Sequence, residues 1–416
     1  MTPSHPQATV NEAFFNPLAG LAPQSSHCSS NPGFSDQHYL NLGVQRILEA
    51  SDSGRGFLQE HGLRYAAPTL STYFYAFQSQ RRLEMLTEVS RLFLVETDNR
   101  LRDRLPQIPE LKRYQCFAMD GHWHKAAVHD LRHDGTKMAV GHFYSLNLRT
   151  HSLRHLTAGE GLHEHDMSAL KRIKPKGLRA GVPKGTRTII IYDKAAIDFQ
   201  FWHRCRQECA VYFISRVKKG MVFELVRELE WDRTDLCQNG ITGDRLVKTS
   251  EGYDLRIVDY TDPRTGEAYQ FLTDVMDLSP GVIAELYRRR WEAEKVFDEI
   301  KNKLGETKAW ASSLIAKTAQ AQFIAITHNL LVIYEQGLQE RHGVKNEAED
   351  KRRAQRAETA RQSCAAIGQP ANSFITTAQG ATQRSVKLIR WLRDAMHTGL
   401  AEAAAVPQLK ALYARL

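Results

Sequence analysis

The pattern of apolar and charged positions is most regular between Ser279 and Leu304, where it predicts one long helix. Ser279 is placed to supply an N-cap oxygen, and Pro280 fits the first helical position, where its missing N–H costs nothing. Gly305 is a suitable C-terminal stop. A helix of this length fixes which side chains share a face.

One face of this predicted helix carries a narrow strip of polar side chains. At about 100° per residue, Tyr287, Arg290, Glu294 and Lys301 all fall on that strip. The adjoining sector is apolar and predicts a buried face, formed by Leu286, Val296, Phe297, Ile300 and Leu304. The pattern therefore places one carboxylate beside two cations and a phenol at the edge of the core. A simpler alternative is a solvated face on which these charges pair with one another.

Two short apolar runs upstream each lead to an aspartate. RYQCFAMDG predicts a strand that delivers Asp120 to its end, with Gly121 opening a turn, and RTIIIYD predicts a buried strand that ends at Asp193. Across this region the pattern predicts three strands, a helix, a strand, a helix and a strand. This order resembles the ribonuclease-H-like fold, in which the first and fourth strands present carboxylates side by side.

Composition limits the classes of protein that remain. The 416 residues carry a formal net charge of +9 and a pI near 9.2, which suits a polyanionic partner without demanding one. No apolar run reaches the length of a membrane span, and the N-terminus lacks the form of a signal peptide. Six scattered cysteines do not make a secreted disulfide framework. We therefore expect a cytoplasmic protein with no membrane partner.

The spacing of the polar strip is itself specific. Tyr287-x2-Arg290-x3-Glu294-x6-Lys301, within LYRRRWEAEKVF, resembles the Tyr-Arg-Glu-Lys signature of DDE-type transposases encoded by bacterial insertion sequences. It is similar to the branch whose ribonuclease-H-like core carries a β-strand insertion. The resemblance covers roughly residues 114–310.

This resemblance implies a metal site and a DNA-binding strip. Asp120, Asp193 and Glu294 would form the catalytic DDE triad and hold Mg2+, with Mn2+ as a possible substitute. The residues implied to bind DNA are Tyr287, Arg290 and Lys301. Elementary chemistry agrees, because carboxylates suit hard divalent cations, and two such ions about 3.5 to 4 Å apart support phosphodiester cleavage. Guanidinium and ammonium groups match phosphate charge.

The implied function is transposition of DNA. The protein would bind double-stranded DNA at the terminal inverted repeats of an insertion sequence, and would act as an endonuclease in Mg-dependent strand cleavage and in strand transfer to target DNA. Its partners would include a second copy of the chain, as a homodimer in the synaptic complex. Its location would be the bacterial cytoplasm, associated with the nucleoid when bound to DNA.

The same resemblance divides the α/β chain into six parts. They are a loose N-terminal tail (1–35), a helical DNA-binding region (36–110), the first part of the ribonuclease-H-like core (111–219), a β-rich insertion (220–278), the glutamate helix and the following helix of the core (279–335), and a helical C-terminal region (336–416). An independent small β domain is an alternative interpretation of 220–278. In the second part, Arg81, Arg82, Arg91 and Arg100 are either phosphate contacts or a solvated helix face.

Other acidic residues compete for the three metal-binding positions. The family often has Gly and then Ser or Thr after its first Asp, whereas this chain has DGHWHKAAVHD, so Asp130 is an alternative to Asp120. Asp198 and Asp298 are similar alternatives for the second and third positions.

Two other functions are also compatible with the sequence. Asp120, His122 and His124 alternate as an extended segment would present them, and His129 follows, so a metal-dependent hydrolase using zinc is one alternative. The other is a catalytically inactive DNA-binding regulator derived from a transposase.

Overall fold

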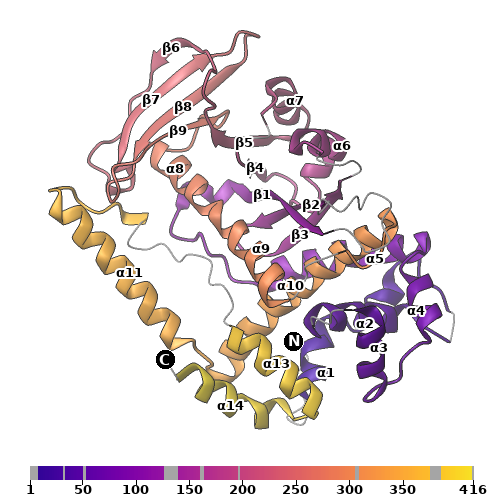
Figure 1. The fold of residues 1–416 in the computed structure, drawn as a ribbon. Coiled ribbons are helices and arrows are strands. Elements are labelled where there is room, and N and C mark those ends of the chain that lie inside the picture. Colours follow the sequence, from indigo (N-terminus) through magenta and orange to yellow (C-terminus); the bar gives the residue numbers. More distant parts are fainter. Residues whose placement is uncertain are drawn as a thin grey trace.

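One mixed sheet of nine strands organises the protein, for which we describe a computed structural model (Figure 1). The structure describes residues 8–30, 33–49, 53–125, 139–159, 164–194, 197–304, 309–374 and 386–414. The strand order across the sheet is β3-β2-β1-β4-β5-β9-β8-β7-β6. The strands are β1 (Tyr114–Lys125), β2 (Ala139–Asn147), β3 (Leu153–Ala158), β4 (Arg187–Ile191), β5 (Val211–Arg216), β6 (Glu224–Glu228), β7 (Ile241–Lys248), β8 (Asp254–Thr261) and β9 (Ala268–Thr273).

The first five strands form the predicted ribonuclease-H-like core. β1, β2 and β3 are antiparallel neighbours, whereas β4 and β5 add to β1 in parallel. Helix α6 (Asp166–Leu178) connects β3 to β4, and α7 (Phe199–Cys209) connects β4 to β5. The observed order of three strands, helix, strand, helix and strand confirms the predicted fold class.

Alternation of side chains along the strands builds a core on each face of this sheet. In β4, Ile189 and Ile191 belong to one apolar cluster and Ile190 to the other. The Ile190 side is covered by α6 and α7. The opposite side is covered by α8 (Pro280–Arg289), α9 (Trp291–Lys303) and α10 (Leu314–His342) (Figure 1).

The β-rich segment continues the core sheet. β9 pairs antiparallel with β5, with Ile214 opposite Thr273, and β8, β7 and β6 follow outward. A hairpin turn joins β8 to β9, since the Asp262 N–H donates to Glu267 O at 2.8 Å and Gly266 has φ +73°. Hydrogen bonding across the β5–β9 junction makes this segment an extension of the core sheet.

Two local predictions around the carboxylates are wrong. β1 does not end at Asp120, because Gly121 stays in the strand opposite Phe143 and pairing with β2 continues to Lys125. The predicted single helix is interrupted at Arg290, where hydrogen bonds tighten to i→i+3, from the Arg290 N–H to Tyr287 O at 3.1 Å.

Ser279 is the N-cap residue of α8, as expected, but its hydroxyl does not cap the helix. It donates instead to a Glu110 carboxylate oxygen at 2.8 Å. Pro280 does occupy the first turn. The predicted stop at Gly305 lies outside the described residues.

The predicted loose tail is wrong for residues 8–30. Helix α1 (Val10–Phe15) forms there, with a capping box between Thr9 and Glu12. Val10, Phe14 and Leu18 are fully buried, because they pack into the same apolar cluster as α10. Ser, Pro and Asn in this segment end short helices without preventing the apolar residues from being buried.

Helices make up the flanking regions, as expected. They are α2 (Asp36–Glu49), α3 (Gly54–Gly62), α4 (Leu70–Ala76), α5 (Gln80–Arg100), α11 (Glu347–Ala366), α13 (Val386–Thr398) and α14 (Glu402–Ala414). Among the described residues, no helix combines the length and apolar character needed to span a membrane. The division of the chain into six parts stays a prediction.

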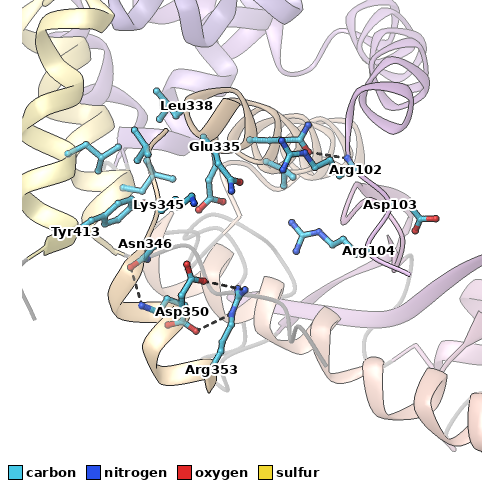
Figure 2. Close-up of a pocket in the computed structure, with 17 residues that line it drawn as sticks. Arg102, Asp103, Arg104, Glu335, Leu338, Lys345, Asn346, Asp350, Arg353 and Tyr413 are labelled. Atoms are coloured by element: carbon cyan, nitrogen blue, oxygen red, sulfur yellow. Dashed lines mark hydrogen bonds and ion pairs between the residues drawn. The ribbon is translucent and has the colours of Figure 1, made fainter. Parts of the chain in front are cut away.

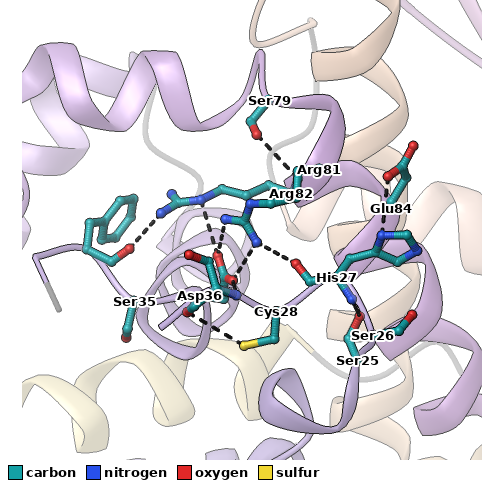
Figure 3. A network of polar contacts seen from close by, with 12 residues as sticks. Ser25, Ser26, His27, Cys28, Ser35, Asp36, Ser79, Arg81, Arg82 and Glu84 are labelled. Carbon is teal, nitrogen blue, oxygen red and sulfur yellow. Dashed lines mark hydrogen bonds and ion pairs between the residues drawn. The ribbon is translucent and has the colours of Figure 1, made fainter. Parts of the chain in front are cut away.

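Three of the four N-terminal arginines considered as phosphate contacts form internal ion pairs, and Figure 3 shows those of Arg81 and Arg82. Arg81 donates to Asp36 at 2.7 Å, and Arg82 lies 3.3 Å from the same buried carboxylate. Arg100 pairs with Glu96 on α5. Of the four arginines considered as phosphate contacts, Arg91 is the exposed one without a recorded ion pair in the described residues. A helix face with internal pairing therefore accounts for the other three.

Candidate active site

Strand register brings Asp120 and Asp193 to the same place. The parallel ladder between β1 and β4 ends with Ala118 opposite Ile191. Asp120, within β1, and Asp193, just after β4, each lie two residues beyond that last pair, so both lie at the same edge of the parallel ladder. Both line a small cavity of about 20 Å3. Equal offsets from a common register explain why aspartates that are distant in sequence come together.

Glu294 reaches this edge from α9 through an arginine. The Arg290 guanidinium donates to Glu294 Oε1 at 2.7 Å and lies 3.4 Å from Asp120 Oδ2. The Arg290 side chain is only 9% exposed, so water screens these ion pairs weakly. The structure therefore brings all three predicted carboxylates to one region, with Arg290 between Asp120 and Glu294.

Accumulated negative charge changes the protonation of this region. Burial above all, with smaller contributions from the Glu294 and Asp166 charges, raises the pKa of Asp120 to about 6, against the opposing effects of Arg290 and the Gly121 N–H. Burial and the neighbouring Asp193 also raise the pKa of Asp166. The positive charge of Arg290 thus offsets only part of the negative charge of Asp120, Glu294 and Asp166.

Asp166 is a residue that the sequence analysis missed. It is the first residue of α6 and lines the same small cavity as Asp120 and Asp193. The strand order contains the signal for it: β3 runs antiparallel to β2 and hence parallel to β1, so β3 ends at the edge where Asp193 lies. Helix α6, which follows β3, therefore begins near that edge, and its first residue is Asp166.

The donor atoms suit a hard divalent cation. Mg2+ is commonly held by one or two carboxylates together with waters and substrate phosphates. In the part of the chain that the structure describes, no three acidic, His or Cys side chains lie close enough to share one ion. Pairs of carboxylates are available, and Asp120 and Asp193 line one cavity. The chemistry of the site therefore fits Mg2+ held by two carboxylates at a time.

A larger groove of about 620 Å3 begins at Asp193 and runs along α8, β8 and β9. Its cationic lining residues are Lys194, Arg216, Arg264, Arg288, Arg290 and Lys295, and its aromatic ones are Tyr260, Tyr269, Phe271, Tyr287, Trp291 and Phe374. Two of the cations are paired within the groove, Arg264 with Asp262 and Arg288 with Glu285, and the cations still outnumber the lining acids. Trp291 is 60% exposed, whereas Tyr287 is buried against Phe271, with ring centroids 4.9 Å apart. Cations and flat rings in one groove suit a phosphate backbone with bases beside it.

The structure settles the position of several competing residues. Asp198 is the N-cap of α7, where it accepts the Phe201 N–H at 2.8 Å. His122 is buried and stacks on Phe297. Asp298 lies on α9, one turn beyond Glu294.

Some predicted residues are only partly described or not described. Lys301 lies in α9, but its side chain is outside the described part, as is that of His124. His129 and Asp130 lie outside the described residues altogether, so Asp130 stays an alternative to Asp120.

A second cavity, of about 410 Å3, lies away from the carboxylates, between α10, α11, α14 and residues 102–104 (Figure 2). Its cations are matched by acids. Arg353, for example, lies 3.9 Å from both Glu349 and Asp350. The cavity lacks the excess positive charge that would favour a phosphate.

Known proteins can now be compared with this geometry. The site combines an acidic edge with a ribonuclease-H-like sheet. Residues 149–330 match the family model described as a transposase DDE domain, so this segment is similar to that family. The matched segment, less than half of the chain, contains Asp193 and Glu294 but begins after Asp120.

Similarity outside the family model is weak. No curated protein matches the chain. A solved structure, the piggyBac transposase synaptic complex with hairpin DNA, is 10% identical, with a TM-score of 0.38 over 96% of this chain and 81% of that one. Membership in the bacterial insertion-sequence branch stays a prediction.

Because the pKa of Asp120 is raised, ionisation of Asp120 lowers the free energy of unfolding. The folded protein keeps this proton up to about pH 6, whereas an unfolded Asp releases it near pH 4. The folded state therefore binds more protons in that interval, and the free energy of unfolding falls as pH rises through it. We expect Asp120→Asn, measured by urea unfolding in EDTA, to be about 2 kcal/mol more stable than wild type at pH 8, with the gain disappearing below pH 4.

Asp198→Asn provides a matched control with the opposite sign. Burial alone would raise the pKa of Asp198, but hydrogen bonds from Lys171 and the Phe201 N–H outweigh it and lower that pKa. Its contribution is present at neutral pH and is lost as pH falls through the lowered pKa. A gain for Asp120→Asn that does not change with pH would contradict our account of the site.

Proposed function

We propose that the protein is a transposase of the bacterial insertion-sequence type, which cleaves DNA at the ends of its element and joins them to target DNA. The observation that carries this proposal is the convergence of Asp120, Asp193 and Glu294 in a chain of which residues 149–330 match the transposase DDE domain family. The proposal includes Mg2+ as cofactor, terminal inverted repeats as the DNA bound, a homodimer in the synaptic complex, and a cytoplasmic, nucleoid-associated location.

Asp120, Asp193 and Glu294 are the proposed metal ligands. When bound, Mg2+ would neutralise charge on the phosphoryl oxygens and make a water or DNA hydroxyl a better nucleophile. Asp120 must be ionised to contribute, and burial opposes this, since it raises its pKa to about 6. At neutral pH the side chain is mostly ionised and therefore able to act as a ligand.

Tyr287, Arg290 and Lys301 are the proposed DNA contacts. Arg290 lines the groove that begins at Asp193 and also pairs with Glu294, so a phosphate near the triad would compete with that carboxylate for the guanidinium. Tyr287 lines the same groove, where its hydroxyl can donate to a phosphate oxygen. The helical region 36–110 is the proposed second DNA-binding region, with Arg91 among its exposed cations.

The two alternative functions find less support. A zinc hydrolase would need the His122 ring to face an open site, but this ring is 6% exposed and packs on Phe297. An inactive regulator would have no need to keep three carboxylates together at the cost of the raised pKa of Asp120. Selection for DNA binding alone does not explain that arrangement.

Removing a triad carboxylate should separate cleavage from binding. We expect Asp120→Ala, Asp193→Ala and Glu294→Ala each to lose cleavage of labelled element-end DNA in Mg2+ while retaining most of their affinity for it, because phosphate contacts with cations supply most of that affinity. The control is Asp198→Ala, which removes an N-cap worth about 1 kcal/mol but should still cleave. Wild-type cleavage by the Asp193 or Glu294 variant would refute the mechanism, and by the Asp120 variant would move the first ligand to Asp130.

Lys301 should contribute one phosphate contact. We expect Lys301→Ala to lower the slope of log affinity against log salt by about one, because each neutralised phosphate releases close to one counterion. Lys410, an exposed lysine on α14, supplies the matched control Lys410→Ala, for which the slope should stay at the wild-type value. Equal slopes for both variants would remove Lys301 from the DNA-binding strip.

A further inference from the structure

A buried ion pair joins the turn between β2 and β3 to the first turn of α9. We propose that His151, acting through Glu292, is a positioning residue that sets the rotation of α9, and with it the positions of Arg290 and Glu294. This inference rests on the proposed function, because it concerns the geometry of the same carboxylate site.

Glu292 and Glu294 point to opposite sides of α9. They are two residues apart, which is about 200° around a helix. The Glu294 side chain is 35% exposed and meets Arg290, whereas that of Glu292 is 5% exposed and faces the protein interior. Any rotation of α9 that moves Glu292 therefore moves Glu294 by the same angle. A fixed partner for Glu292 fixes the direction of Glu294.

His151 is that partner. Its Nε2 contacts Glu292 Oε2, and the two side chains are only 6% and 5% exposed. A buried carboxylate without its partner would be costly, so the contact between His151 and Glu292 strongly restricts rotation.

The backbone of His151 is itself fixed. The residue has φ +61°, in the left-handed region that few residues other than glycine adopt. Its carbonyl accepts a hydrogen bond from His328 Nε2 of α10 at 2.9 Å. Asn329 of α10 binds the next strand at both Leu153 N (2.7 Å) and Leu153 O (3.0 Å). The turn is therefore held against α10.

Helix α5, which precedes the sheet in the sequence, holds the same turn as well. Asp98 of α5 accepts hydrogen bonds from Thr150 Oγ1 at 2.5 Å and Ser152 Oγ at 2.6 Å, on either side of His151. The turn is thus anchored to α5 and α10. The His151 side chain connects this anchored turn to α9. Such supporting residues typically change metal affinity or activity 10- to 100-fold when they are lost.

Two substitutions separate the side chain from its unusual backbone. His151→Gly keeps the left-handed conformation at no steric cost and removes the imidazole. His151→Gln keeps a donor of similar reach for Glu292. We expect His151→Gly to lower kcat for cleavage of labelled element-end DNA by 10- to 100-fold, with KM for DNA within about threefold of wild type, and His151→Gln to recover most of the rate.

Mn2+ affinity, measured by electron paramagnetic resonance on the protein without DNA, is the second readout. It should weaken in His151→Gly and recover in His151→Gln, if α9 sets the position of Glu294. His397→Ala, which breaks a comparable His–Glu contact (3.4 Å to Glu49) far from α9, should leave both readouts at wild-type values.

The outcomes distinguish this inference from the proposed function. If wild type cleaves and His151→Gly has the same kcat and Mn2+ affinity, the positioning role is wrong and the function stands. If wild type binds Mn2+ but does not cleave DNA, the function fails, and the change in Mn2+ affinity still decides the role of His151. A lower melting temperature with unchanged kcat would make His151 purely structural and would also overturn the inference.

Discussion

The charge of Arg290 between two carboxylates is the interaction on which the site depends. Asp120 lies on β1 and Glu294 on α9, which are far apart in the sequence. The Arg290 guanidinium contacts both carboxylates, Asp120 at 3.4 Å and Glu294 at 2.7 Å. The compensation is incomplete, because the pKa of Asp120 remains raised to about 6. A divalent cation and a DNA phosphate would each relieve part of this imbalance, the first by neutralising the acids and the second by attracting the arginine.

The rest of the fold determines where these charged side chains lie. The β1–β4 register sets Asp120 beside Asp193, and the anchored turn that carries His151 sets the rotation of α9. The strands that follow β5 extend the same sheet and, with α8, form a basic, aromatic groove that begins at Asp193. The proposed DNA-binding groove and the proposed metal site thus share one continuous framework, in which α8 and α9 meet at Arg290.

The sequence predicted the parts of this framework that depend on local pattern. The order of strands and helices followed from apolar periodicity, and the spacing from Tyr287 to Lys301 indicated the polar strip. The break at Arg290 was missed because its backbone angles stay helical, and only the change to i→i+3 backbone hydrogen bonds marks the place. Asp166 was missed because its neighbours across the cavity come from β1 and β4, which only the sheet topology brings near. The burial of Phe14 likewise depends on distant helices.

Cleavage of DNA by the wild-type protein tests the central claim most directly. The assay uses a labelled duplex that carries the terminal sequences of the element encoding the chain, incubated with the protein in Mg2+ or in EDTA. Our account predicts strand cleavage at the element end in Mg2+, and binding without cleavage in EDTA. Cleavage of equal rate in EDTA, or binding in Mg2+ without any cleavage, would contradict it, and the second result would identify the protein as a DNA-binding regulator.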